Sequence, residues 1–238
     1  MASHGARWFS ASLRQKLFRA TQLAVGAPLV TFGGLYLWTR RCSFEPFGPE
    51  TSPLYQHPIL KIINPRNNPS SDDCCVRSVP FSDIKPNLLK DARRGGTSLI
   101  EAFCGGYEIQ RNLMHLTKHE SSSNDLWTSD EIRNSKFEPG TVITNHFIVL
   151  EKTPTALTFR GCLGPRQTPM APQDLDNLFE LSAVVNEEKK VVEFRLKCIT
   201  FDGTDLMARE DPFGGFPGLL HRQYAKLLVE AAAGNCTK

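Results

Sequence analysis

The chain has 238 residues, enough for one or two domains with a sizeable hydrophobic core. Its formal net charge of +3 is too small for a nucleic-acid-binding surface, and no predicted element carries a basic stripe interleaved with aromatic residues. Seven cysteines, an odd number without repeated spacing, indicate neither a disulfide framework nor a zinc site.

Residues 1–43 form a basic segment followed by a candidate membrane anchor. Residues 20–39 carry no charged side chain, and as a helix they would span about 30 Å, the thickness of a bilayer's hydrocarbon core. Arg40 and Arg41 close this segment. We therefore expect a single-pass membrane protein of the endoplasmic reticulum or the mitochondrial inner membrane. The alternatives are a cleaved signal or transit peptide and a buried helix.

The segment that follows is predicted to lead the chain into a folded domain. Residues 44–73 are rich in proline, asparagine and serine, which indicates an extended linker with little regular structure. Residues 74–84 are expected to form a first short strand. Short helices are predicted at 85–91 and 97–103, and a longer amphipathic one at 107–118.

The centre of the chain predicts two consecutive β-hairpins. Their strands are residues 141–151 with 156–162, and residues 178–185 with 191–201. The second hairpin alternates apolar and polar side chains with period two, which indicates one buried and one solvated face. On the polar face Glu180 is expected near Arg195 or Lys197, as a cross-strand pair that contributes roughly 0.2–1 kcal/mol.

The last predicted element is a long amphipathic helix at residues 218–233. Pro217 suits its first turn and Gly234 suits its end. An antiparallel sheet and such a helix can bury both apolar faces against each other. From this order of elements we predict an α+β domain at residues 74–234, a START-like helix-grip fold with a curved antiparallel sheet packed on the C-terminal helix. Residues 235–238 form a tail.

Several short motifs give the chain a resemblance to a known family. They are CVRSVP at 75–80, LIEAFC at 99–104, GTVITNHF at 140–147, LFELS at 178–182 and LHRQY at 220–224. Together they resemble small fungal proteins that are often encoded beside secondary-metabolite enzymes. The resemblance covers roughly residues 44–233 and implies an N-terminal membrane segment and a START-like or polyketide-cyclase-like domain. The family pattern has a longer Gly/Trp/Tyr run where this chain has only Gly105 and Gly106.

His146 and Arg160 are the candidate catalytic residues. In a continuous strand His146 would share a face with Val142, Ile148 and Leu150, and a neutral imidazole in an apolar cavity could act as a general base. Arg160 on the adjacent strand could bind a carboxylate or enolate. The opposite face of the first strand is also apolar, so the register stays open. Alternatively, His146 bonds a neighbouring strand or water, and Arg160 faces solvent.

Five further side chains are candidates for lining a ligand cavity. Phe147, Phe179 and Phe194 come from the predicted strands, and His221 and Tyr224 lie one turn apart on the C-terminal helix. Tyr224 shares the apolar stripe of that helix, which is equally typical of a core residue with its hydroxyl at the rim. His221 borders the stripe and can equally be exposed or half-covered.

No metal site and no cofactor is expected from the sequence. His115 and His119 have a spacing of four, but the glutamate and third ligand of a zinc motif are missing. Asp72 and Asp73 are interpreted as solvated turn charges.

The resemblance and the predicted fold together indicate a membrane-anchored protein that binds a small hydrophobic molecule in secondary-metabolite biosynthesis. One hypothesis is a cyclase or isomerase acting on a polyketide- or terpenoid-like intermediate. The alternative is a non-catalytic lipid or metabolite binding or transfer module. Expected partners are the ligand, the membrane and biosynthetic enzymes at the same membrane, whereas nucleic acid is not expected.

Overall fold

A computed structural model of the chain describes residues 33–106, 124–162, 171–206 and 214–238. The chain separates into two compact units, residues 1–40 and residues 41–238. In the first unit the described residues 33–39 are helical. Within the described part of the chain, every helix is too short or too polar for a membrane span. Most of the predicted anchor, residues 20–39, lies outside the described residues.

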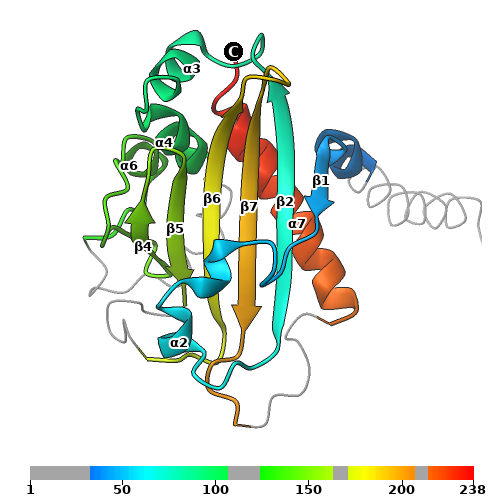
Figure 1. The fold of residues 1–238 in the computed structure, drawn as a ribbon, viewed down its shortest axis with the longest axis vertical. Helices are drawn as coiled ribbons and strands as arrows, with labels where there is room; N and C mark the ends of the chain where they lie inside the picture. Colours follow the sequence, from blue (N-terminus) through cyan, green and yellow to red (C-terminus); the bar gives the residue numbers. More distant parts are fainter. Residues whose placement is uncertain (1–32, 107–123, 163–170, 207–213) are drawn as a thin grey trace, which may run out of the picture. The chain divides into compact units, whose positions relative to one another are not determined.

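In the second unit the described residues form one seven-stranded sheet in which all neighbouring strands are antiparallel. The order across the sheet is β1-β2-β7-β6-β5-β4-β3 (Figure 1). The strands are β1 (Cys42–Glu45), β2 (Ser70–Pro80), β3 (Val142–Ile143), β4 (Phe147–Lys152), β5 (Ala156–Gly161), β6 (Asp176–Asn186) and β7 (Val191–Phe201). One face of the sheet is crossed by α7 (Phe216–Gly234) (Figure 1). The predicted α+β class, antiparallel sheet and long C-terminal helix are therefore confirmed.

The second predicted hairpin is confirmed over its whole length. Strands β6 and β7 pair residue by residue from Asp176↔Phe201 to Asn186↔Val191. Within this register Glu180 lies opposite Lys197, and the Lys197 Nζ is 2.7 Å from the Glu180 Oε1. The expected cross-strand ion pair is thus present.

The strand predicted at 141–151 is interrupted by a turn that contains His146. Thr144 and Asn145 have φ of 52° and 55°, and with His146 they form the three-residue turn that folds β3 back on β4. Two consecutive positive φ values are typical of the tight turns of β-hairpins. In the resulting register Ile148 pairs with Arg160, on the face of the sheet that points away from α7. The face that the sequence assigned to His146 is therefore not the face covered by the C-terminal helix.

Helices and short turns occupy the remaining described segments. They are η1 (Pro53–Gln56), α2 (Leu60–Ile63), α3 (Pro86–Ala92), α4 (Ser98–Gly105) and α6 (Ser129–Arg133). Helices α3 and α4 match the two short helices predicted at 85–91 and 97–103. Helix α7 contains Pro217 in its first turn and ends at Gly234, as predicted. The helix predicted at 107–118 lies outside the described residues.

The main hydrophobic core lies between the sheet, α4 and α7. Phe194 of β7 and Phe103 of α4 are both fully buried, with ring centroids 4.8 Å apart. Val229 and Ala232 of α7 are also fully buried in this core. Phe194, a predicted cavity residue, is thus a packing residue at the centre of the core.

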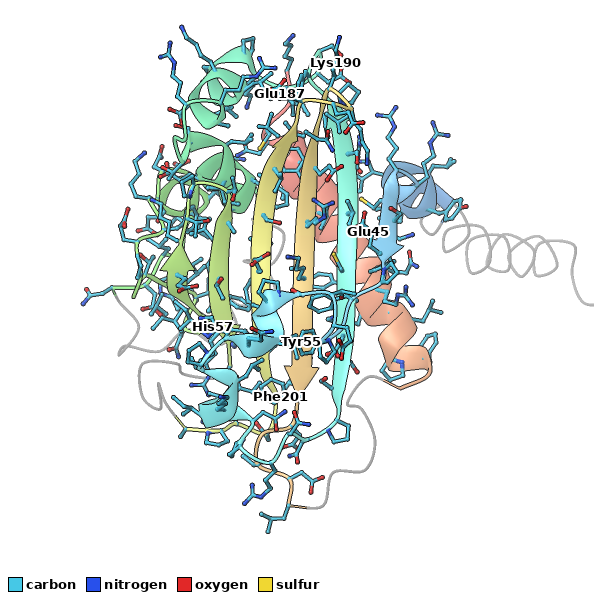
Figure 2. The ribbon with its side chains drawn as sticks, in the orientation of Figure 1. Glu45, Tyr55, His57, Glu187, Lys190 and Phe201 are labelled. Carbon is cyan, nitrogen blue, oxygen red and sulfur yellow. The ribbon has the colours of Figure 1, made fainter. Side chains whose placement is uncertain are left out.

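The opposite face of the sheet carries a second, smaller core, which corrects the prediction for residues 44–73. Leu54 and Ile63 pack there with Phe201, and Tyr55 lies over the same face (Figure 2). Prolines and polar residues separate these apolar side chains along the sequence. The segment therefore shows no periodic pattern that would predict a helix or a strand. The segment predicted to carry little regular structure therefore contains the second half of β1, all of η1 and α2, and the start of β2.

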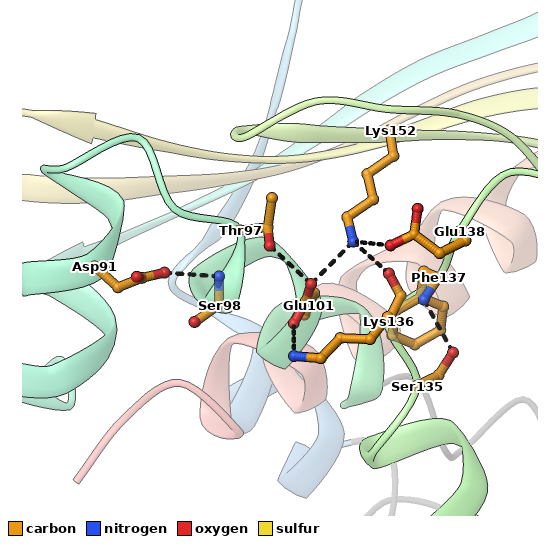
Figure 3. Close-up of polar contacts among 9 residues, drawn as sticks. All are labelled: Asp91, Thr97, Ser98, Glu101, Ser135, Lys136, Phe137, Glu138 and Lys152. Carbon is orange, nitrogen blue, oxygen red and sulfur yellow. Dashed lines mark hydrogen bonds and ion pairs between the residues drawn. The ribbon is translucent and has the colours of Figure 1, made fainter.

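Glu101 of α4 ties the helical layer to the sheet through a buried polar network (Figure 3). It is 8% exposed and accepts hydrogen bonds from Lys136 at 2.9 Å, Lys152 at 2.9 Å and Thr97 at 2.8 Å. Burial alone would raise the pKa of Glu101, but these three donors outweigh it and hold the pKa below the ordinary value. The charged carboxylate therefore stabilises the fold.

Replacing Glu101 with glutamine should lower the free energy of unfolding by about 1–3 kcal/mol, because Lys152 loses a buried charged partner. Urea unfolding against pH measures the effect. The wild-type advantage should be complete above about pH 4.5, the ordinary pKa, and disappear as pH falls through the lowered pKa. Arg93→Gln, which breaks the exposed Arg93–Glu187 pair, should leave stability unchanged. If both substitutions lower the free energy of unfolding equally, burial is not the reason that Glu101 stabilises the fold.

Candidate functional site

One row of paired residues crosses the sheet on the face that α7 covers. The strand registers pair Asp73 of β2 with Cys198, Cys198 with Phe179, Phe179 with Phe159, and Phe159 with Val149. Directly paired residues lie on the same face of a sheet. This helix-face row therefore places a carboxylate at one end and aromatic rings in the middle.

The aromatic part of the row is a cluster of three phenylalanines. The rings of Phe159 and Phe179 stack at 4.9 Å with 6° between their planes. The ring of Phe147 meets Phe179 edge-on at 5.6 Å. Phe159 is fully buried, whereas Phe147 and Phe179 are only half-buried. The structure thus brings together two of the predicted ligand-binding residues, and both keep part of their apolar surface accessible.

The polar end of the row is a pair formed by Asp73 and His221. The His221 Nε2 of α7 lies 3.1 Å from the Asp73 Oδ2. Asp73 is only 8% exposed, so its interpretation as a solvated turn charge is wrong. The physical reason is that β2 begins at Ser70, which puts Asp73 inside a strand and turns its side chain toward α7.

Two buried polar atoms near this pair are left without a hydrogen bond to any described residue. They are the Asp73 Oδ1 and the hydroxyl of Tyr224, which lies one helical turn beyond His221. Burial raises the pKa of Tyr224 to about 12, so its hydroxyl is neutral and available as a donor. Buried polar groups in native proteins nearly always have a partner. Such atoms on the same face as half-exposed aromatic rings are the strongest sign of a ligand site.

Cys198, in the same row, is not a nucleophile in this environment. Burial raises the pKa of its thiol to about 12, and its Sγ lies 3.3 Å from the Thr200 Oγ1. The thiolate is the reactive form of cysteine, and it is unpopulated at neutral pH with such a pKa. Cys198 acts as a small buried side chain, as the sequence predicts.

Arg160 lies on the opposite face of the sheet, locked to Asp176. Both side chains are fully buried, with Arg160 Nε 3.0 Å from Asp176 Oδ1 and Arg160 Nη2 2.6 Å from Asp176 Oδ2. Burial raises the pKa of Asp176, and the guanidinium of Arg160 opposes that shift. The Arg160 Nη2 also donates to the carbonyl of Ala171 at 2.5 Å. A guanidinium held in this way stabilises the folded chain, because it neutralises Asp176 and binds the backbone at Ala171.

His146 lies between β3 and β4, at the end of the tight turn. Its Nδ1 is 2.6 Å from the carbonyl oxygen of Thr144, and its ring centroid is 6.2 Å from that of Phe147. It is 9% exposed. The polar pair beside α7 is formed by Asp73 and His221. It is not formed by His146 and Arg160, the two catalytic candidates from the sequence. Asp73 could have been found from an earlier start of the strand predicted at 74–84.

Arg160→Met should lower the free energy of unfolding by about 3–5 kcal/mol, because Asp176 is left buried without its counter-charge. The double variant Arg160→Met/Asp176→Leu should recover most of this loss, since neither charge then remains. Thermal and urea unfolding of the three proteins measure the difference. A double variant as unstable as the single one would contradict a purely structural role for the pair.

Tyr224→Phe should raise the free energy of unfolding by about 1 kcal/mol, because it removes a buried hydroxyl without a partner and keeps the ring. Tyr224→Leu is the control that removes the ring as well, and it should be destabilised by lost packing. Calorimetry of the ligand-free protein gives both values. Destabilisation by Tyr224→Phe would reveal a hydrogen-bond partner for the hydroxyl.

No family model, curated protein or solved structure matches the chain. The likeness to fungal secondary-metabolite proteins therefore stays a prediction. Among the described residues, His, Cys, Asp and Glu side chains form no group of three or more that could hold a metal ion. The helix-face row, with the Asp73–His221 pair and Tyr224, is the candidate functional site of this chain.

Proposed function

We propose that residues 41–238 form a START-like helix-grip domain that binds a hydrophobic small molecule between the sheet and α7. The observation that carries this proposal is the pair of buried polar atoms without partners, the Asp73 Oδ1 and the Tyr224 hydroxyl. They share their face of the sheet with the half-buried rings of Phe147 and Phe179. An apolar surface with a few placed polar groups is the usual make-up of a small-molecule site.

The two polar atoms define the chemistry of the ligand. A carboxylate oxygen accepts a hydrogen bond, so Asp73 suits a ligand hydroxyl or an acidic C–H group. A neutral phenol donates, so Tyr224 suits a ligand carbonyl. The aromatic rings suit the apolar remainder. An oxygenated, mostly apolar molecule of the polyketide or terpenoid kind has all three features.

The same groups can support an isomerase or cyclase reaction. Asp73 would take a proton from a carbon next to the ligand carbonyl, and Tyr224 would donate a hydrogen bond to the developing enolate oxygen. The His221 Nε2 lies beside this carboxylate, 3.1 Å from the Asp73 Oδ2. In an isomerisation the same proton returns at another carbon. In a cyclisation the enolate carbon attacks a second carbonyl, and the proton goes to that oxygen.

The alternative is a carrier that binds the ligand without changing it. The half-buried Phe147 and Phe179 favour this reading, because they provide apolar contact area that requires no chemistry. Either activity fits a protein anchored by residues 1–43 to the endoplasmic reticulum or the mitochondrial inner membrane. There it would exchange an apolar intermediate with biosynthetic enzymes at the same membrane.

Purified full-length protein should carry a ligand that mass spectrometry detects after solvent extraction. Asp73→Asn and Tyr224→Phe should each reduce its retention. Asp72→Asn is the matched control, since the neighbouring carboxylate pairs with Ile199 on the opposite face and should not affect retention. Ligand retained at the wild-type level by Asp73→Asn would overturn the site.

Activity on the extracted ligand then separates the two functions. In an enzyme, Asp73→Asn should slow turnover by about 10²–10⁴-fold, since the amide cannot take up the proton. A carrier would show no product with either protein.

The anchor has its own test. Full-length protein should remain in the membrane pellet after a carbonate wash, because residues 20–39 carry no charge and have bilayer length. A chain that begins at Arg41, the start of the second compact unit, should be found in the supernatant. Release of the full-length protein by carbonate would exclude the anchor.

A further inference from the structure

A hollow lies beside α3, at the end of the sheet where the C-terminus also lies (Figure 1). Its volume is about 380 Å³. Phe81, Ile84 and Leu89 supply its apolar lining, and the side chains of Ile84 and Leu89 are buried beneath it. The hollow shares no residue with the helix-face row.

The rest of the hollow is lined mostly by positive charge. Lys90, Arg94 and Lys238 line it, and none of the three forms an ion pair with a carboxylate among the described residues. The Lys238 Nζ is held by the carbonyl oxygen of Ser82 at 2.6 Å. Three such cations around one concave surface repel one another unless an anion lies between them.

The fourth cation of the hollow is held in a fixed position. Arg93 forms two hydrogen bonds to Glu187, at 2.6 Å and 3.0 Å, and its guanidinium lies 4.8 Å from the ring centroid of Phe81. Glu187 lies on the turn between β6 and β7, at the same end of the sheet (Figure 2). Arg93 therefore already has a carboxylate partner, and the other three cations are left for a ligand.

We propose that this hollow binds a phosphate-bearing amphiphile. The phosphate would lie among Lys90, Arg94 and Lys238, and the apolar portion would lie against Phe81 and Leu89. A phosphate carries about −1.5 to −2 charges at neutral pH, which matches several unpaired cations better than a carboxylate does. Arginine and lysine are the side chains that bind phosphate oxygens best. The apolar lining favours a phospholipid over a free phosphate ester.

Full-length protein in uncharged detergent can be titrated by calorimetry with dihexanoyl phosphatidic acid and, separately, with glycerol 3-phosphate. The lipid should bind the wild-type protein, and glycerol 3-phosphate should bind at least tenfold more weakly. Lys90→Ala/Arg94→Ala should weaken lipid binding at least tenfold. Lys61→Ala/Arg66→Ala removes two exposed cations elsewhere and should leave lipid affinity unchanged.

Three results would overturn the proposal. If the wild-type protein does not bind the lipid, the hollow is not a phospholipid site. An equal loss in both double variants would show that net charge, and not the hollow, attracts the lipid. Glycerol 3-phosphate binding as tightly as the lipid would assign the hollow to soluble phosphate esters. All exchanged cations are exposed, so circular dichroism should show that the wild-type protein and the two double variants are folded identically.

Discussion

The register of β2, β7 and β6 is the constraint on which the rest of the structure depends. These three strands pair along eleven-residue ladders, and successive side chains of a strand point to opposite faces. A shift of one position along a strand therefore decides which face a side chain lies on. On one face it meets α7, and on the other it meets η1 and α2. The neighbouring aspartates show the consequence. Asp73 begins the helix-face row beside Cys198, whereas Asp72 lies opposite Ile199 in the second core.

How far the sequence predicts this arrangement depends on how clearly each element signals its register. The second hairpin alternates strictly, so its strands and the Glu180–Lys197 pair are predictable. The sequence does not predict the β3–β4 turn, because Thr144 and Asn145 are not accompanied by glycine or proline. They also lie within a run of β-branched residues, which is typical of a continuous strand. The turn keeps Val142 and Ile148 on one face, because these two residues pair directly. Both faces of the run are apolar, so the sequence does not show which face meets α7.

The sequence predicts the aromatic residues and the histidine of the candidate site, but not its carboxylate. Phe147, Phe179, Tyr224 and His221 follow from apolar faces that periodicity reveals. The acidic partner required knowing that β2 starts at Ser70, and the serines and aspartates there resemble a loop. Pairing with β7 outweighs that local preference, because the ladder satisfies the backbone groups of the segment that face β7. Tertiary pairing, which no local pattern contains, thus placed Asp73.

Buried carboxylates on the two faces of the sheet differ in how completely they are paired. On the face away from α7 the charged groups are matched, as in Arg160–Asp176 and Lys197–Glu180. On the face of α7, the Asp73 Oδ1 and the Tyr224 hydroxyl have no partner among the described residues. Each such group costs about 1–3 kcal/mol, a large share of a total stability of about 5–15 kcal/mol. Phenylalanine at position 224 would avoid its share of that cost with the same ring. A ligand that bonds both atoms would offset it, which is why the helix-face row is the place to expect one.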